Sequence, residues 1–205
     1  MALKHHVYPL FSEPLFRTNL GGVITDEHIA YIRNLKMVPN RENLISENLY
    51  IFEEPELAAI RDAAQEALDL YAGHVLGISQ KLYITQSWAL TNMPGIGMHS
   101  HAHANSVVSG TLYYCEMPKP APKVIFDRHR SYQQLQLVPE PGRVNLYNTL
   151  KNAVVPEAYD MVLFSSGMLH MVEENQSNQP RHAIAFNSFV KGKLGDYRDV
   201  SELVL

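Results

Sequence analysis

The sequence predicts a mainly β fold, a two-sheet jelly roll or a barrel, braced by two helices on its N-terminal side. Two helical apolar patterns occur within residues 1–78, whereas apolar and polar residues alternate from Lys81 onward. Successive side chains of a strand point to opposite faces, so a period of two is typical of half-buried strands. Several short strands behind two helices favour two packed sheets.

The two expected helices have recognisable ends. Thr25 can cap a short helix that ends before Pro39, and Pro55 begins a longer one that runs to Gly77. In the longer segment, apolar residues recur at helical spacing: Leu57, Ile60, Ala64, Ala67, Leu68, Tyr71 and Val75. We expect both helices to be scaffold that packs one apolar face on the core.

The first expected strand begins at Lys81. Its apolar face carries Leu82, Ile84, Gln86, Trp88 and Leu90. Further strands are expected at 106–115, 123–126, 144–147, 153–155, 161–164 and 181–190, separated by clusters rich in proline, glycine and asparagine. The chain is expected to form one domain over 1–205, with a helical part at 1–78 and a jelly-roll core at 80–192.

Composition narrows the class of protein. The chain has 205 residues, 46% hydrophobic and 19% charged, with a net charge of -4, which gives no electrostatic footprint for nucleic acid. Cys115 is the single cysteine, and no apolar run approaches the ~20 residues of a transmembrane helix. We expect a cytoplasmic protein without a membrane partner, and a homodimer is a reasonable expectation for this size.

Histidines at a spacing of two are the most informative feature. His99, His101 and His103 would lie on one face of a strand, and His170 follows a separate apolar run. Imidazole suits zinc, iron, copper and nickel, and a facial set of ligands leaves coordination positions open. A structural zinc site commonly uses four ligands, often cysteines, and this chain has one cysteine. The pattern therefore predicts a metal site that can bind further ligands.

These residues belong to a longer pattern. In order, it comprises His101-x-His103, Asn105-Ser106, Ser109-Gly110, Tyr113-Tyr114, Pro156-Glu157, Leu163-Phe164, His170, Asn175, Arg181 and Ala185-Phe186-Asn187. Over residues 81–190 the sequence resembles the iron(II)/2-oxoglutarate-dependent oxygenases of bacteria and phages. The resemblance implies a double-stranded β-helix (a cupin-like jelly roll), Fe(II), 2-oxoglutarate as cosubstrate, and a dioxygenase that hydroxylates a C–H bond.

One position departs from the wider superfamily, whose pattern is His-x-Asp/Glu with a distal histidine. Here His103 occupies the carboxylate position. We favour His101, His103 and His170 as the metal ligands; the other register would use His103 with Asn105, whose neutral amide is a poor iron ligand. His99 is expected at the rim of the pocket, although the sequence leaves direct ligation open.

The resemblance also implies residues that bind the cosubstrate. Arg181 comes eleven residues after His170, where the superfamily has a basic residue that holds the distal carboxylate of 2-oxoglutarate, and a guanidinium binds a carboxylate bidentately. We expect Arg181, Tyr113 and Asn187 to bind the cosubstrate. Trp88 and Asn92 are weaker candidates for residues that line the mouth of the pocket. No catalytic residue beyond the metal ligands is expected.

Two other functions fit the same ligands. A three-histidine, cupin-like dioxygenase would oxidise a thiol without 2-oxoglutarate, and a non-catalytic jelly roll would keep a metal only for binding or structure. The substrate, a small molecule or a protein side chain, is not identified. The loops expected to select it, 40–47 and 128–141, carry no recognisable motif.

Overall fold

The computed structural model describes residues 3–128 and 138–205. The helical elements are α1 (Asp26–Arg33), the 3-10 turns η1 (Ile51–Glu53) and η2 (Pro55–Leu57), α2 (Ala58–Leu70) and the π-helical η3 (Tyr71–Leu76). The strands are β1 (Leu15–Asn19), β2 (Met37–Pro39), β3 (Leu44–Ser46), β4 (Lys81–Asn92), β5 (Met98–His101), β6 (Val108–Leu112), β7 (Val124–Asp127), β8 (Lys151–Val154), β9 (Asp160–Ser165), β10 (His170–Val172), β11 (Arg181–Lys191), β12 (Lys193–Leu194) and β13 (Leu203–Val204).

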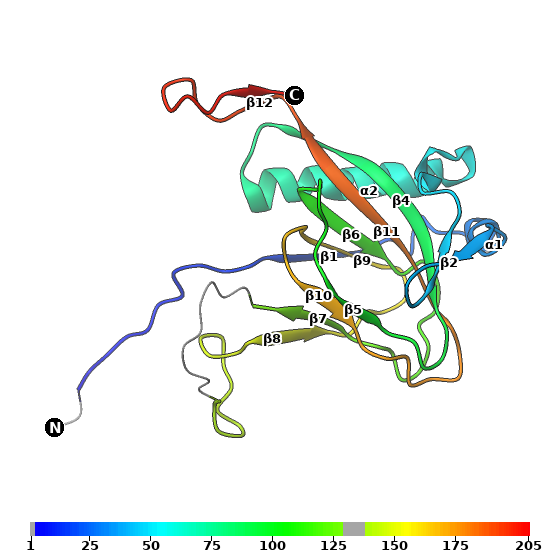
Figure 1. The fold of residues 1–205 in the computed structure, drawn as a ribbon, viewed down its shortest axis with the longest axis horizontal. Coiled ribbons are helices and arrows are strands. Elements are labelled where there is room, and N and C mark those ends of the chain that lie inside the picture. The colour runs from blue at the N-terminus through cyan, green and yellow to red at the C-terminus, as the bar shows by residue number, and fades with distance from the viewer. Residues whose placement is uncertain (1–2, 129–137) are drawn as a thin grey trace.

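Two antiparallel sheets form the body of the protein (Figure 1). The larger has the order β1-β9-β6-β11-β4-β3-β2, and the smaller has the order β5-β10-β7-β8. One apolar cluster contains side chains from both sheets, including Leu90 and Ala183 of the large sheet and Val124 and Phe126 of the small one. The sheets therefore face each other, as the predicted jelly roll requires.

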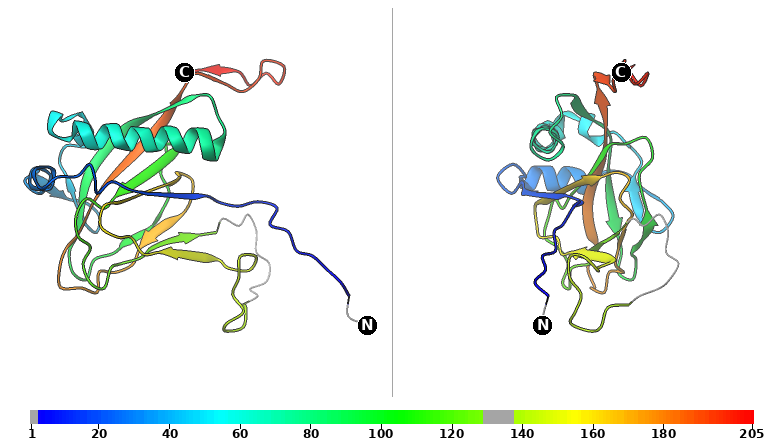
Figure 2. Two further views of the ribbon diagram at one scale, coloured as in Figure 1. Left: turned by 180° about the vertical axis from the view of Figure 1, so that it is seen from behind. Right: turned by 90° about the vertical axis from the view of Figure 1, so that its left-hand side faces the viewer.

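The helices cover the opposite face of the large sheet, and Figure 2 shows α2 lying across it. Ile60 and Leu68 of α2 are fully buried, in one cluster with Ile184 and Phe186 of β11. This confirms the amphipathic helix expected from Pro55 to Gly77. Gly77 has a φ of 64°, and this left-handed residue ends the helix.

Thr25 caps α1 as expected, and the cap is reciprocal. The Thr25 side chain accepts a hydrogen bond from the His28 backbone N–H at 3.3 Å, and the His28 ring accepts one from the Thr25 N–H at 3.1 Å. An imidazole thus takes the place that glutamate or glutamine usually has in a capping box.

No described helix is long and apolar enough to cross a membrane.

Some sequence expectations about the elements were wrong or incomplete. Residues 144–147 form an exposed turn, with Val144 62% exposed, because alternation stabilises a strand only where a sheet face can bury it. The part expected to be helical also supplies β1, β2 and β3 to the large sheet. These strands have three to five residues, too few to show a period.

Gly110 shows how closely β6 and β11 approach. A Cβ atom at this position would lie 2.2 Å from Cζ of Phe186, whose ring covers the glycine. Real Cβ atoms do not come this close to another heavy atom, so the pairing of β6 with β11 requires glycine here. The opposite face of β11 presents Arg181, Ala183 and Ala185 to the space between the sheets.

Candidate metal centre

Three histidines meet on the small sheet, at the side that faces the large one. His101 ends β5 and lies opposite His170, the first residue of the neighbouring strand β10. His103 follows two residues after His101, and its ring centroid lies 5.2 Å from each of the other two. One nitrogen atom from each ring lies within 4.8 Å of the others. Residues about 70 positions apart in the sequence are thus brought together by strand pairing.

Hydrogen bonds decide which nitrogen of each ring is free. Nδ1 of His101 lies 2.8 Å from the His99 carbonyl, and Nδ1 of His170 lies 3.0 Å from the Met168 carbonyl. A carbonyl oxygen can only accept, so each Nδ1 carries the proton and each Nε2 keeps its lone pair. Nδ1 of His103 likewise faces Oδ1 of Asn187 at 2.7 Å. All three rings therefore present Nε2 as a ligand atom.

The donor set fits a metal ion. Nε2 of His103 is buried and has no hydrogen-bond partner among the described residues, and buried polar atoms are rarely left unpaired. An ion bound to the three Nε2 atoms would satisfy it.

Burial also favours the neutral form of two of the rings, those of His103 and His170, and metal ligands must be neutral imidazoles. Desolvation lowers the pKa of His170 to about 4; the hydrogen bond to the Met168 carbonyl opposes this shift, and His101 and His103 add to it. Desolvation likewise lowers the pKa of His103, against the opposing effect of its hydrogen bond to Asn187. Protons therefore compete weakly for these two ligands at neutral pH.

A chain of polar side chains supports His103 from behind. Oδ1 of Asn187 accepts a second hydrogen bond, from the Ser109 hydroxyl at 2.9 Å, and Ser109 lies 2.8 Å from Oγ of Ser166. The Ser166 carbonyl in turn accepts the backbone N–H of His103 at 2.9 Å. Asn187 lies opposite a β-bulge of β4, where one residue of β11 faces two of β4, and it points to the same face of β11 as Arg181 and Ala185.

An inner cavity of about 70 Å³ adjoins the three histidines, and Arg181 lies at its wall. Arg181 is 2% exposed. Its guanidinium donates to Oδ1 of Asn92 at 3.0 Å and to the Tyr113 hydroxyl at 3.3 Å, while Nε has no partner among the described residues. None of the described residues that line this cavity is acidic. Arg181 is thus a buried cation that has no carboxylate partner in the described chain.

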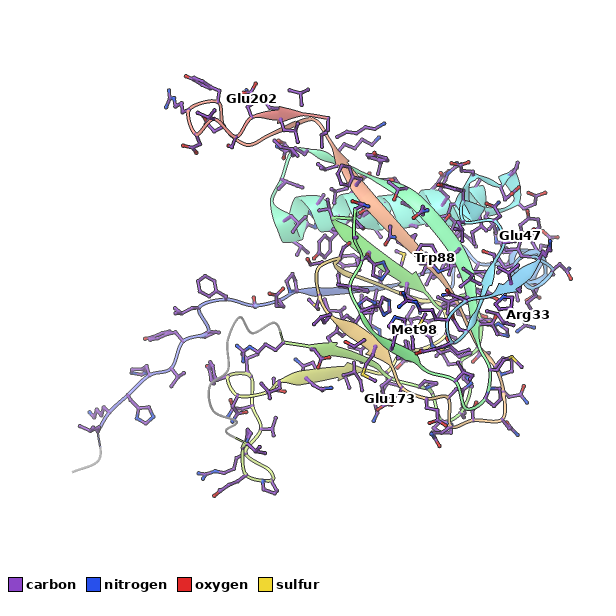
Figure 3. The ribbon with its side chains drawn as sticks, viewed as in Figure 1. Arg33, Glu47, Trp88, Met98, Glu173 and Glu202 are labelled. Carbon is purple, nitrogen blue, oxygen red and sulfur yellow. The ribbon has the colours of Figure 1, made fainter. Side chains whose placement is uncertain are left out.

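An outer cavity of about 360 Å³ lies on the other side of the histidines. The two cavities share four wall residues: Trp88, Met98, His101 and His103. Trp88 comes from β4 of the large sheet and Met98 from β5 of the small one, and both are labelled in Figure 3. The rest of the outer wall comes from the turn between β2 and β3, from β3 and the segment after it, from β4 and β5, from the segment after β5 and from Asn187 of β11.

The structure brings together most of the residues singled out in the sequence. Tyr113, Trp88 and Asn92 line the inner cavity with Arg181. Only one of the two adjacent tyrosines can do so, and Tyr114 is buried on the helix-covered side.

Three other candidates lie elsewhere. Asn187 was expected to touch the cosubstrate, but it lines the outer cavity and holds His103. His99 lies at the outer rim, where its ring is 3.5 Å from Glu42, and it is outside the three-histidine group. Asn105 is exposed, with a φ of 54°, and lines neither cavity.

Sequence reasoning missed the contributions of the turn 40–43. Glu42 accepts the backbone N–H of His99 at 2.8 Å and so ties this turn to β5. Asn40 and Arg41 line the outer cavity. The loop 40–47 had been expected to select the substrate, but no periodic signal marks single residues in a turn. Of the second such loop, residues 129–137 lie outside the described part of the chain.

Comparison with known proteins gives both a family and a fold. Residues 86–187 match the protein family described as "Putative 2OG-Fe(II) oxygenase". No curated protein sequence matches. A prolyl-4-hydroxylase from Pseudomonas putida superimposes with a TM-score of 0.57 at 16% identity, covering 88% of this chain and 95% of its own.

Two further solved structures are similar at the level of the fold. HygX from Streptomyces hygroscopicus, solved with nickel, 2-oxoglutarate and hygromycin B, has a TM-score of 0.58 and 13% identity, covering 86% of this chain and 82% of that one. The epimerase SnoN from nogalamycin biosynthesis, in complex with Fe3+ and alpha ketoglutarate, has a TM-score of 0.60 and 12% identity, over 86% of this chain and 79% of that one.

Proposed function

This chain belongs to the 2OG-Fe(II) oxygenase family, and from that premise we propose that it hydroxylates a C–H bond with His101, His103 and His170 as the iron ligands. One observation carries the proposal: three imidazoles with free Nε2 atoms and a buried, unpaired Arg181 line the same small cavity. A metal cation would bind the three imidazoles, and a dicarboxylate would supply the negative charge that Arg181 lacks.

The iron ligands are proposed to be the three Nε2 atoms. Iron bound there would supply the activation of O₂ coupled to decarboxylation of the cosubstrate, with the balance R–H + 2-oxoglutarate + O₂ → R–OH + succinate + CO₂. Because His103 replaces the usual carboxylate, the protein contributes no negative charge to the ligand set. This favours an anionic chelator at the remaining positions.

Arg181 is proposed to hold the distal carboxylate of 2-oxoglutarate. A buried charge without a partner is strongly unfavourable, whereas a charge-assisted pair with a carboxylate compensates its desolvation. Asn92 and Tyr113 hold the guanidinium in place. Ala185 beside it leaves space, and Phe164 and Val162 supply apolar walls that exclude water.

Asn187 is proposed to orient His103 instead of contacting the cosubstrate. Its Oδ1 is already used by His103 and Ser109. The carboxamide therefore holds the ring in the tautomer that a metal requires.

The cellular location proposed for this enzyme is the cytoplasm. Cys115 is a buried free thiol, and burial raises its pKa, so it is an unreactive side chain that suits a reducing compartment. Formation of a homodimer stays a prediction.

The decisive experiment loads the protein anaerobically with Fe(II) and adds 2-oxoglutarate. We expect the weak visible charge-transfer band of bidentate chelation, and succinate formation once O₂ is admitted. Chelation without succinate from any substrate would favour a non-catalytic binding protein. Iron binding without chelation at millimolar 2-oxoglutarate would contradict the proposal and favour a thiol dioxygenase, which oxygen uptake with small thiols would then detect.

A further inference from the structure

The outer cavity is the place where a substrate can reach the metal centre. The inner cavity holds Arg181, and His101 and His103 lie in the wall between the two spaces. If the inner cavity holds the cosubstrate, the substrate must approach from the outer side. A volume of about 360 Å³ is at the lower end of the range for small-molecule sites.

The charged groups at the outer cavity have one sign. Among the described residues that line it, Arg41 is the only lysine or arginine, and none is an aspartate or glutamate. Neighbouring Glu42 is occupied by His99, whose backbone N–H it accepts. Arg41 forms no ion pair in the described chain, and residues 129–137 contain no acidic residue. Among the described residues, Arg41 is therefore the charged side chain that lines the cavity, whereas the Glu42 carboxylate lies outside the lining, against His99.

The polar groups near the metal centre add hydrogen-bond donors. Asn187 has its Oδ1 committed to His103 and Ser109, so only its NH₂ group can serve a ligand in the outer cavity. A cavity with a guanidinium and an amide donor in its wall complements an acceptor-rich, anionic molecule and disfavours a cationic one.

Asn40 and Gln86 also line the outer cavity, and much of the remaining wall is apolar. Ile45 and Leu49 come from the turn side, and Trp88 and Met98 from the side shared with the inner cavity. These side chains suit a hydrocarbon body. A molecule whose carboxylate lies at Arg41 would extend its carbon chain along this wall toward His101 and His103.

We propose that the outer cavity binds a small organic acid, with its carboxylate at Arg41 and its hydrocarbon part against Trp88 and Met98. This rests on the proposed function, because it places the substrate relative to the occupied inner cavity. Arg41 then determines specificity by charge, and it touches neither the metal ligands nor the cosubstrate.

Trp88 makes the test direct, because it is the only tryptophan of the chain and lies in the wall of both cavities. The protein is first loaded with Ni(II) and saturated with 2-oxoglutarate, each followed by tryptophan fluorescence. Straight-chain carboxylates from butanoate to decanoate are then titrated in, each against the uncharged amide of the same length. Failure in the loading steps would contradict the proposed function; failure with the acids alone would contradict only this inference.

We expect saturable quenching by at least one acid, and an affinity about tenfold higher than that of its amide. Arg41→Gln should remove that difference while nickel and 2-oxoglutarate still bind as in the wild type. Arg61→Gln is the matched control, since Arg61 lies on α2, paired with Asp62, and it should change nothing. Equal affinity for acid and amide, no saturable binding of any acid, or an equal loss in both variants would overturn the proposal.

Discussion

The two cavities on either side of the histidines are built differently. The inner one is lined by strand residues such as Arg181, Ala185 and Val162, and holds one buried cation. The outer one is larger and takes much of its wall from the turn 40–43 and the segment after β5. Rigid strands suit an invariant cosubstrate, whereas turns tolerate the sequence changes that alter substrate choice.

Substitution of Arg181 should have the largest effect, and it tests whether the inner cavity is the cosubstrate site. Arg181→Leu should weaken 2-oxoglutarate binding by about 2 to 5 kcal/mol, or roughly 30- to 5,000-fold, because a buried charge-assisted pair is lost. Calorimetry on the Ni(II)-loaded protein measures it. Nickel affinity should be unchanged, and Arg143→Gln, at an exposed arginine paired with Glu140, is the control. Unchanged cosubstrate affinity would remove the distinction between the two cavities.

The pH dependence of the free energy of unfolding tests how far the His170 ring is buried from solvent at the metal centre. The pKa of His170 is about 4 when folded and 6.5 unperturbed, so the unfolded apoprotein binds more protons between these values. Stability is therefore complete above pH 6.5 and falls by about 3 kcal/mol as the pH drops to 4. Urea unfolding of metal-free protein checks this. His170→Gln should lack this part of the loss, and parallel curves would mean that the ring is solvated.

His103 tests whether an imidazole stands in for the carboxylate. His103→Ala should weaken Ni(II) binding by at least about 100-fold, because loss of a ligand costs more than the roughly 10- to 100-fold that loss of a group supporting a ligand costs. His103→Asp should stay within about tenfold of the wild type, because a carboxylate completes the usual facial triad. Competition with a fluorescent chelator gives both affinities. Full metal retention by the alanine variant would mean that another residue is the third ligand.

Substitutions of Asn187 should have the smallest effect, and they test whether this residue supports His103 or contacts the cosubstrate in the inner cavity. Asn187→Ala should weaken metal binding by about tenfold, since His103 loses the acceptor that fixes its tautomer. Asn187→Asp keeps an acceptor at this position and should restore most of the affinity. If Asn187→Ala weakened 2-oxoglutarate binding without affecting the metal, the residue would belong to the inner cavity after all.

Much of the fold could be read from periodicity, and the failures have a physical cause. Long elements such as α2 and β4 repeat their pattern often enough to be recognised, and both were predicted. β2 and β3 have three residues each, and only pairing makes them strands: β3 pairs with β4, and β2 pairs with β3. Residues 144–147 alternate in the same way but find no sheet to join.

The sequence by itself determined the chemistry of the metal centre, because a spacing of two places His101 and His103 on one side and because the order of residues to Arg181 identifies the family. Only the tertiary structure decided what surrounds it. The pairing of β5 with β10 sets His170 opposite His101, and β11 brings Asn187 to within 2.7 Å of His103. The turn 40–43 brings Arg41 to the outer cavity. Such contacts join segments far apart in the chain, so no local pattern encodes them.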